Sequence, residues 1–322
     1  MLHDKHDGIF TKIYNASKKF VAHFESILSR PTNYSVSGLI VPLYTAPGDD
    51  WTRVINEKLE HPLVPIIAIV NPQNGSGTSQ IAAYTDATKQ LEVVHVTVLG
   101  YVYTGYGGRN STDVKNEISN YKNWYHADGI FFDEMSSVPG NEMYYKDLSN
   151  YAKSLGMKYT VGNPGRSTSA SYVGTVDNLV VYDNPGLPQV ATISNLNGSS
   201  SKNDFAIMAF GVDHFNQSYV ANTTQYVKYL YITNGTLPDP WMSVSPYLDN
   251  LTATMQGLMV SENQAKAAPP LRQLKSGVAP SDVTCSYGFQ LVLKKESGIP
   301  ACVKPESVSV LIQRNWGDDA TQ

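Results

Sequence analysis

The chain has 322 residues, of which 42% are apolar and 16% charged, and its formal net charge is −4. This length suits one large domain with a small appendage, or two ordinary domains. The weak negative charge excludes the basic footprint of a nucleic-acid-binding protein, and no run of Lys and Arg suggests a polybasic membrane contact. No uninterrupted apolar stretch is long enough for a transmembrane segment.

The first 35 residues show the spacing of an amphipathic helix. Six apolar side chains recur on one face of this predicted N-terminal helical arm, residues 1–35, which we expect to pack against the domain that follows. They are Ile9, Phe10, Ile13, Phe20, Phe24 and Ile27. Residues 1–30 contain no apolar region typical of a signal peptide, so an exported form would have lost a leader or would use another route.

Eight short apolar runs follow and predict buried strands at residues 38–44, 64–71, 94–102, 129–134, 158–162, 178–183, 205–211 and 229–233. Helical segments are predicted between them at 79–91, 112–125 and 141–155, with shorter ones after the fifth and sixth strands. We expect Ser111-Thr112-Asp113 to cap the second of these helices and Gly156 to end the third. This alternation predicts an α/β fold, a (β/α)8 TIM barrel over residues 36–260. A doubly wound sheet would usually show a G-x-G-x-x-G turn after its first strand.

The composition changes after Val260. Residues 261–270, ending in Ala267-Ala268-Pro269-Pro270, are typical of a linker, and residues 271–322 are predicted to form a small C-terminal module. The only two cysteines, Cys285 and Cys302, lie in this module and predict a local disulfide and an oxidising compartment. Two buried free thiols are the alternative, and a zinc site lacks further ligands.

Nine Asn-x-Ser/Thr sequons favour a secreted glycoprotein. They begin at Asn15, Asn33, Asn74, Asn110, Asn197, Asn216, Asn222, Asn234 and Asn250. Each alone is a weak signal in a chain this rich in Asn, Ser and Thr. We therefore expect an extracellular or cell-surface location from the sequons and the cysteines together.

Polar residues at the predicted strand ends point to a reaction class, because barrel enzymes place their reactive groups at the C-terminal ends of strands. These ends carry Tyr44, Asn71, Tyr101, Tyr103, Asp133, Glu134, Asp183, Asp213, His214 and Asn234. Carboxylates beside aromatic rings are what glycoside hydrolysis requires. The fourth and sixth strands are next-but-one neighbours, so we expect Asp133 and Asp183 to converge at either the retaining or the inverting separation.

Asp133 and Glu134 are consecutive, so in a regular strand they face opposite sides. Both reach the pocket only if the strand turns into its loop at Glu134. Otherwise one is catalytic and the other pairs with a neighbour or caps the next helix. An acidic pair at the end of an apolar strand is costly unless it is paired or used, which favours a catalytic role for Asp133 and Glu134, with Asp183 as the third acid.

Aromatic and amide groups near these acids are candidate substrate-binding residues. A sugar ring could stack on any of four tyrosines, although packing is the commoner role of tyrosine, and Trp51 is equally a packing or a stacking residue. His214 is a candidate hydrogen-bonding group, but a lone His after a strand is more often structural. The substrate-binding set is therefore Tyr44, Asn71, Tyr101, Tyr103, Tyr106 and His214.

Other chemistries find less support. The glycine-rich segments 74–77 and 105–108 follow the second and third strands, whereas phosphate sites of barrels usually follow the seventh and eighth, and they are more often tight turns. No G-x-S-x-G elbow follows a strand, which argues against a Ser-His-Asp hydrolase.

Several motifs together resemble the spherulin-4 family in the same order over residues 38–250. They are Val41-Pro42-Leu43-Tyr44 with Pro47-Gly48 and Trp51, Ile69-Val70-Asn71-Pro72 with Gly75-Ser76-Gly77, Leu99-Gly100-Tyr101-Val102 with Thr104, Tyr106 and Gly107, and Asp128-Gly129-Ile130-Phe131-Phe132-Asp133-Glu134. That family is similar to glycoside hydrolases of the α-1,4-galactosaminidase type, which are (β/α)8 barrels acting on amino-sugar polymers.

The resemblance implies an acidic pair at Asp133 and Glu134 and a third acid after the sixth strand. The family usually has Glu at that third position, whereas this chain has Asp183, whose side chain is shorter by one methylene. The C-terminal module, with Pro300-Ala301-Cys302-Val303 and Arg314-Asn315-Trp316, looks like a tail of secreted archaeal proteins, which implies a cell-surface association.

Two hypotheses follow. The first is an extracellular endo-acting glycosidase on an amino-sugar polysaccharide, needing no metal or cofactor. In it Asp133 is nucleophile or charge stabiliser, Asp183 is general acid/base, and Glu134 positions the substrate or exchanges roles with Asp183. The second is a catalytically inactive barrel that binds cell-surface polysaccharide. A deacetylase acting on the same polymers is disfavoured because the strand ends lack an evident metal-binding His-Asp set.

Overall fold

The computed structural model describes residues 36–197, 200–265, 267–286 and 288–319. The predicted helical arm, residues 1–35, lies outside the described residues. By their internal contacts, the described residues divide into two compact units between Met255 and Gln256. The helix α8, Leu248–Ala265, crosses both this point and the predicted end of the barrel at residue 260. The predicted domain and linker boundaries stay a prediction.

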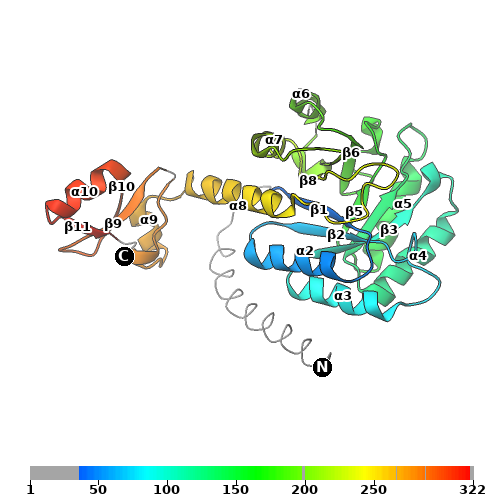
Figure 1. Cartoon of the computed structure of the whole chain (residues 1–322), viewed down its shortest axis with the longest axis horizontal. Helices are drawn as coiled ribbons and strands as arrows, with labels where there is room; N and C mark the ends of the chain where they lie inside the picture. The colour runs from blue at the N-terminus through cyan, green and yellow to red at the C-terminus, as the bar shows by residue number, and fades with distance from the viewer. Residues whose placement is uncertain (1–35, 198–199, 266, 287, 320–322) are drawn as a thin grey trace. The chain divides into compact units, whose positions relative to one another are not determined.

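Eight parallel strands close into a barrel in chain order, with β8 paired to β1 (Figure 1). This confirms the predicted TIM barrel. The strands are β1 (Gly38–Leu43), β2 (Ile66–Val70), β3 (Thr97–Tyr103), β4 (Gly129–Asp133), β5 (Tyr159–Gly162), β6 (Asn178–Pro185), β7 (Phe205–Phe210) and β8 (Tyr229–Ile232). Every residue of β1, β2, β7 and β8 is buried, as expected of parallel strands covered on both faces.

Helices follow most of the strands. In the described part of the barrel they are α2 (Asp49–Glu60), α3 (Ala82–Val93), α4 (Ser111–Tyr125), α5 (Glu142–Ser154), α6 (Val190–Ser194), α7 (Gln217–Thr223) and the start of α8. Figure 1 shows α2 and α3 on one side of the strands and α6 and α7 on the opposite side. Only one 3-10 turn, Ala170–Tyr172, follows β5, which confirms that the helical segments after the fifth and sixth strands are short.

Local chemistry explains where the boundaries depart from the sequence prediction. The third strand was predicted from residue 94, but α3 continues to Val93 and a left-handed turn at His95, φ 62°, delays the strand to Thr97. The cap of α4 is Asn110, whose side chain accepts from the Thr112 N–H at 2.8 Å, so the predicted Ser111–Asp113 cap lies inside the helix. Gly156, φ 80°, does end α5.

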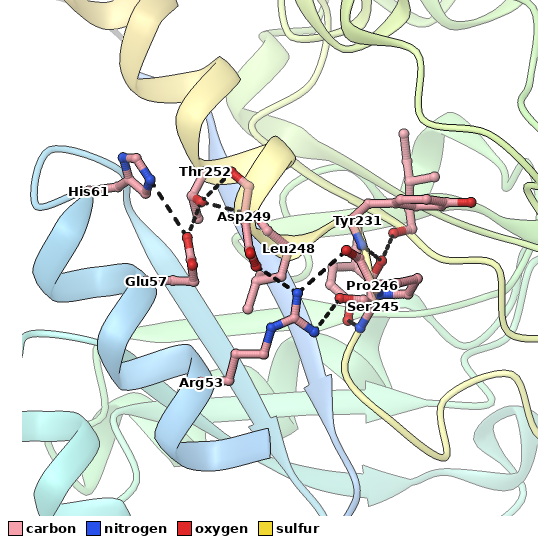
Figure 2. A network of polar contacts seen from close by, with 11 residues as sticks. Arg53, Glu57, His61, Tyr231, Ser245, Pro246, Leu248, Asp249 and Thr252 are labelled. Atoms are coloured by element: carbon pink, nitrogen blue, oxygen red, sulfur yellow. Dashed lines mark hydrogen bonds and ion pairs between the residues drawn. The ribbon is translucent and has the colours of Figure 1, made fainter. Parts of the chain in front are cut away.

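A polar network joins the helix after the first strand to the helix after the last one (Figure 2). The Arg53 guanidinium pairs with Asp249 at 2.6 Å and donates to the Ser245 carbonyl at 2.9 Å. The buried Glu57 carboxylate accepts from the Thr252 hydroxyl, and burial raises the pKa of Glu57. These contacts hold α8 against α2 where the barrel closes.

The second unit contains a three-stranded antiparallel sheet in the order β10–β9–β11. Its elements are α9 (Pro270–Lys275), β9 (Gln290–Lys294), β10 (Pro300–Val303), α10 (Pro305–Gln313) and β11 (Gly317–Asp319). Cys285 and Cys302 form a disulfide with 5.4 Å between their Cα atoms, which confirms the predicted pairing. None of the described helices combines the length and the apolar character needed to cross a bilayer.

The close approach of α4 to β3 generates a stability prediction. A Cβ on Gly100 would lie 2.3 Å from the Tyr121 ring, which is fully buried. We expect Gly100→Ala to lower the free energy of unfolding by about 1–3 kcal/mol through overpacking, measured by thermal denaturation followed by circular dichroism. Gly257→Ala is the control: this exposed α8 position has open space around it, so a gain of up to about 1 kcal/mol is expected. Unchanged stability of Gly100→Ala would contradict this packing.

Candidate active site

Two carboxylates and one amide meet at the C-terminal ends of three successive strands. Asp133 ends β4, Asn163 directly follows β5, and Asp183 lies near the end of β6. The Asn163 Nδ2 group donates one hydrogen bond to Asp133 Oδ1 and one to Asp183 Oδ2, each at 2.9 Å. Twice that distance, about 5.8 Å, is the upper limit for the separation of these two oxygens.

Asn163 is held rigidly by its surroundings. Its backbone N–H donates to the Phe132 carbonyl at 2.8 Å, and its carbonyl accepts from the Met135 N–H at 3.0 Å. Its side-chain Oδ1 accepts from the Gly165 N–H at 2.9 Å, which directs the NH2 end of the amide toward the two acids. Sequence reasoning missed this residue. Its position immediately after the fifth predicted strand is the signal that could have found it.

A β-bulge turns Asp183 toward Asn163. In the pairing of β6 with β7, Val180 faces Ala206 and Tyr182 faces Ile207, so Val181 is an extra residue. Beyond the bulge Asp183 lies on the same face of β6 as Val180, whereas regular alternation would place it on the opposite face. The shift brings the Asp183 carboxylate to Asn163.

Glu134 departs from strand geometry at the point that the sequence analysis identified. The strand ends at Asp133, and Glu134 adopts the left-handed region with φ 50°. Its carbonyl accepts from the Tyr106 N–H at 2.7 Å and from the Thr104 hydroxyl at 2.8 Å, which fixes the turn. The Glu134 carboxylate is near enough for its charge to contribute to raising the pKa of Asp133, so the structure brings the two acids together.

Two predicted substrate-binding tyrosines lie beside Asp133. The Tyr101 hydroxyl donates to Asp133 Oδ2 at 2.9 Å. The Tyr44 ring packs edge-on against the Tyr101 ring, with 5.5 Å between centroids, and Phe131 stacks on the far side of Tyr101 at 6.4 Å. Burial, followed by the charge of Asp133, raises the pKa of both hydroxyls. Both hydroxyls are therefore neutral, and that of Tyr101 donates to Asp133.

The two aspartates have different environments. Burial is the main cause that raises the pKa of Asp183, to about 6, and the charge of Asp133 adds to it. Burial also raises the pKa of Asp133, but hydrogen bonds from the Tyr101 hydroxyl, the Glu134 backbone and the Asn163 amide act against this. Because these donors stabilise its anion, Asp133 carries the negative charge while Asp183 holds a proton more readily.

The side chains of the other predicted binding residues make their contacts elsewhere than with the acids, although Tyr103 pairs in register with Asp133 and the Tyr106 backbone N–H bonds to the Glu134 carbonyl. The Tyr103 ring packs against the Arg109 guanidinium, whose Cζ lies 4.1 Å from the ring centroid. The Asn71 side-chain oxygen accepts a hydrogen bond from the Gly75 N–H at 2.8 Å. Tyr106 is 62% exposed, and His214 is exposed in the loop after β7. Within the part of the chain that the structure describes, no side-chain hydrogen bond or ring contact joins these four residues to Asp133, Glu134 or Asp183. Their binding roles stay predictions.

Trp51 belongs to the core of the barrel. Trp51 is 2% exposed and its indole N–H donates to the Thr45 carbonyl at 3.0 Å, so of its two suggested roles the structure assigns packing. Among the described residues, no group of three or more His, Cys, Asp or Glu side chains is arranged to hold a metal ion.

Comparison with known proteins places this geometry in a family. Spherulin-4 of Physarum polycephalum is 36% identical over 151 residues, which cover 46% of this chain and 45% of that protein, so the match spans less than half of its length. Aspergillus clavatus Sph3, whose crystal structure is a complex with GalNAc, is similar in fold, with a TM-score of 0.60 and 24% identity. That likeness covers 68% of this chain and 97% of Sph3.

The family comparison covers the barrel from its first strand to the start of its last helix. The sequence model of the spherulation-specific family 4 (Spherulin4) matches residues 38–255, which include Asp133, Glu134, Asn163 and Asp183. This extent is about two thirds of the chain, in agreement with the order of motifs found in the sequence. The chain belongs to the spherulin-4 family.

Proposed function

We propose that this protein is a glycoside hydrolase that cleaves internal bonds of an amino-sugar polysaccharide containing N-acetylgalactosamine. The observation that carries the proposal is the Asp133–Asn163–Asp183 arrangement, in which one amide group holds two carboxylates at a fixed short separation beside two tyrosines. The GalNAc complex of Sph3, a protein of similar fold, supports the choice of sugar.

The two aspartates divide the work according to their environments. Asp183, with a pKa of about 6, gives its proton to the glycosidic oxygen of the leaving sugar. Asp133 attacks the anomeric carbon as the C–O bond breaks, and a glycosyl ester forms on its carboxylate. Ionised Asp183 then takes a proton from water, which attacks the anomeric carbon, so that the bond between this carbon and the Asp133 oxygen breaks and Asp133 leaves as the anion. Protons and electron pairs balance over the two steps.

The neighbouring residues position these groups. The Tyr101 hydroxyl holds Asp133 Oδ2, which leaves the orientation of the attacking carboxylate fixed by two donors. Glu134, directed by its left-handed turn, is assigned to binding the substrate near Asp133. Asp183 is shorter than the Glu usual in the family, but its hydrogen bond to Asn163 keeps it within reach of the same sugar-binding space.

The proposed site of action is outside the cell. The Cys285–Cys302 disulfide supports this, because disulfides persist in oxidising compartments. Glycosylation at the sequons and cell-surface association through the C-terminal unit remain predictions from the sequence.

The first prediction concerns activity. The protein is incubated with a polysaccharide of α-1,4-linked galactosamine and N-acetylgalactosamine, and new reducing ends are counted. Asp133→Asn and Asp183→Asn are each expected to reduce kcat/KM by about 100- to 10,000-fold, because each removes a group needed in the transition state. Asp213→Asn is the matched control: this residue is exposed in the loop after β7, and its variant should retain full activity.

Polymer binding without hydrolysis by the wild-type protein would contradict the proposal and support the alternative of an inactive binding barrel. Hydrolysis that survives in Asp133→Asn would show that these acids are not the catalytic pair.

The second prediction concerns stereochemistry. Retaining glycosidases hold their two carboxyl groups about 5–5.5 Å apart, whereas inverting enzymes hold them about 6.5–9.5 Å apart. Since the bridged oxygens of Asp133 and Asp183 lie within about 5.8 Å of each other, we expect retention of the anomeric configuration. Proton NMR during the first minutes of hydrolysis would then show the α-anomer appearing before mutarotation. Initial release of the β-anomer would exclude the double displacement.

The third prediction concerns pH. The pKa of Asp183 lies above its ordinary value, so its proton is held below pH 6 and lost above it; kcat/KM should therefore fall about tenfold per unit well above pH 6. The raised pKa also links stability to pH, because the folded protein holds the Asp183 proton more tightly than the unfolded chain does. This contribution to the free energy of unfolding is fully present below about pH 4 and is lost as the pH rises through about 6.

Asp183→Asn removes this titration. The free energy of unfolding of the variant, relative to that of the wild type, should be greater at pH 8 than at pH 4 by on the order of 1–3 kcal/mol. Denaturant unfolding at both pH values measures this difference. Equal differences at the two pH values would contradict the raised pKa of Asp183.

A further inference from the structure

Trp241 lies in the loop between β8 and α8, at the C-terminal end of the barrel. Its ring contacts Phe210, the last residue of β7, and Tyr231 of β8, with centroid distances of 5.7 and 6.0 Å. The interplanar angles are 83° and 46°, so neither neighbour stacks flat against the indole. Trp241 thus covers the ends of two strands without being enclosed between aromatic rings.

The strand register places this aromatic group on the inner face of the barrel. Asp183 pairs with Met208, and Met208 pairs with Tyr231. Residues in register on neighbouring strands point to the same face, as do residues two apart on one strand. Asp183 faces Asn163 and Asp133, so Tyr231 and Phe210 face the same side. Trp241 therefore lies on the β7–β8 side of the acid pair, next to the strand that carries Asp183.

The indole N–H of Trp241 donates to none of the described residues and is not among their buried unpaired groups. Trp51 provides the contrast, since it is 2% exposed and its N–H is bonded to the Thr45 carbonyl. A buried Trp normally finds a partner for this donor, whereas Trp241 is partly exposed and leaves it open. An apolar ring with an unused donor at its edge matches the C–H face and the hydroxyls of a sugar.

The loop fixes the position of the indole. The backbone N–H of Trp241 donates to Asp239 Oδ1 at 3.1 Å, and the carbonyl of buried Pro240 lies 2.1 Å from where a Cβ on Gly235 would be. At the far end of the loop, the Ser245 N–H donates to the Tyr231 hydroxyl at 2.7 Å (Figure 2). Because the loop is already ordered, ligand binding to Trp241 costs little conformational entropy.

We propose that Trp241 forms a saccharide subsite on the Asp183 side of the cleavage point. The ligand is a pyranose ring of the polymer, with its apolar face on the indole and a hydroxyl accepting from the indole N–H. Tyr101, on β3, lies on the opposite side, where its hydroxyl bonds to Asp133, and the Tyr44 ring packs against it. This inference rests on the proposed function and extends it, because binding sugars on both sides of the acid pair is what cleavage of internal bonds requires.

The test measures binding separately from hydrolysis. In the Asp133→Asn background, the affinity for an α-1,4-linked N-acetylgalactosamine oligomer is determined by calorimetry with and without Trp241→Ala. We expect Trp241→Ala to weaken binding about 10- to 100-fold, as truncation of a central aromatic contact does. Trp241→Phe keeps a stacking ring and should recover most of the affinity. Met242→Ala is the matched control, since this neighbour is 71% exposed and should leave binding unchanged.

A second readout guards against a folding defect. Oligomer binding should change the tryptophan fluorescence of the Asp133→Asn protein, and Trp241→Phe, with an unchanged thermal transition, should abolish that change. Equal affinity with and without Trp241→Ala, or no detectable oligomer binding by the Asp133→Asn protein, would overturn the subsite. A wild type that binds through Trp241 but never hydrolyses the polymer would instead refute the proposed function and leave the subsite standing.

Discussion

The hydrogen bonds of the Asn163 amide to two carboxylates are the contact on which the active-site geometry depends. Two charges about 5.8 Å apart repel by about 3 kcal/mol at an effective dielectric constant near 20, so Asp133 and Asp183 do not ionise independently. The shared donor sets their separation, and the additional donors at Asp133 decide which of them carries the charge. A proton donor and an anion therefore face the same space at mildly acidic pH.

The barrel supplies this arrangement through three adjacent strands, each modified at its end. A left-handed residue follows β4, a backbone clamp to the β4 end holds the residue after β5, and an extra residue in β6 rotates Asp183. Each device acts within one or two residues of the group it directs, while the buried rows of the strands below remain regular. The scaffold can therefore hold costly groups without losing its core.

The strands and the acidic ends were readable in the sequence because continuous apolar runs and terminal carboxylates are local patterns. The pairing of Cys285 with Cys302 followed from their closeness in the chain. Asn163 was missed, since its only signal is its position directly after the fifth predicted strand. The bulge at Val181 could not be predicted either, because it is defined by the register with β7. The role of Trp241 depends on its contacts with Phe210 and Tyr231, which no local sequence pattern indicates.

The unfavourable features of the barrel concentrate at one end. Glu134 adopts a left-handed conformation that costs a non-glycine residue about 1–2 kcal/mol, Asp183 is half-buried and forms no ion pair with the described residues, and the Trp241 indole N–H donates to none of them. These locally unfavourable features occur together, at the place where the binding of a ligand would offset their free-energy cost. Because a sugar polymer would contact all three groups at once, these costs are better explained by one extended binding site than by three unrelated defects.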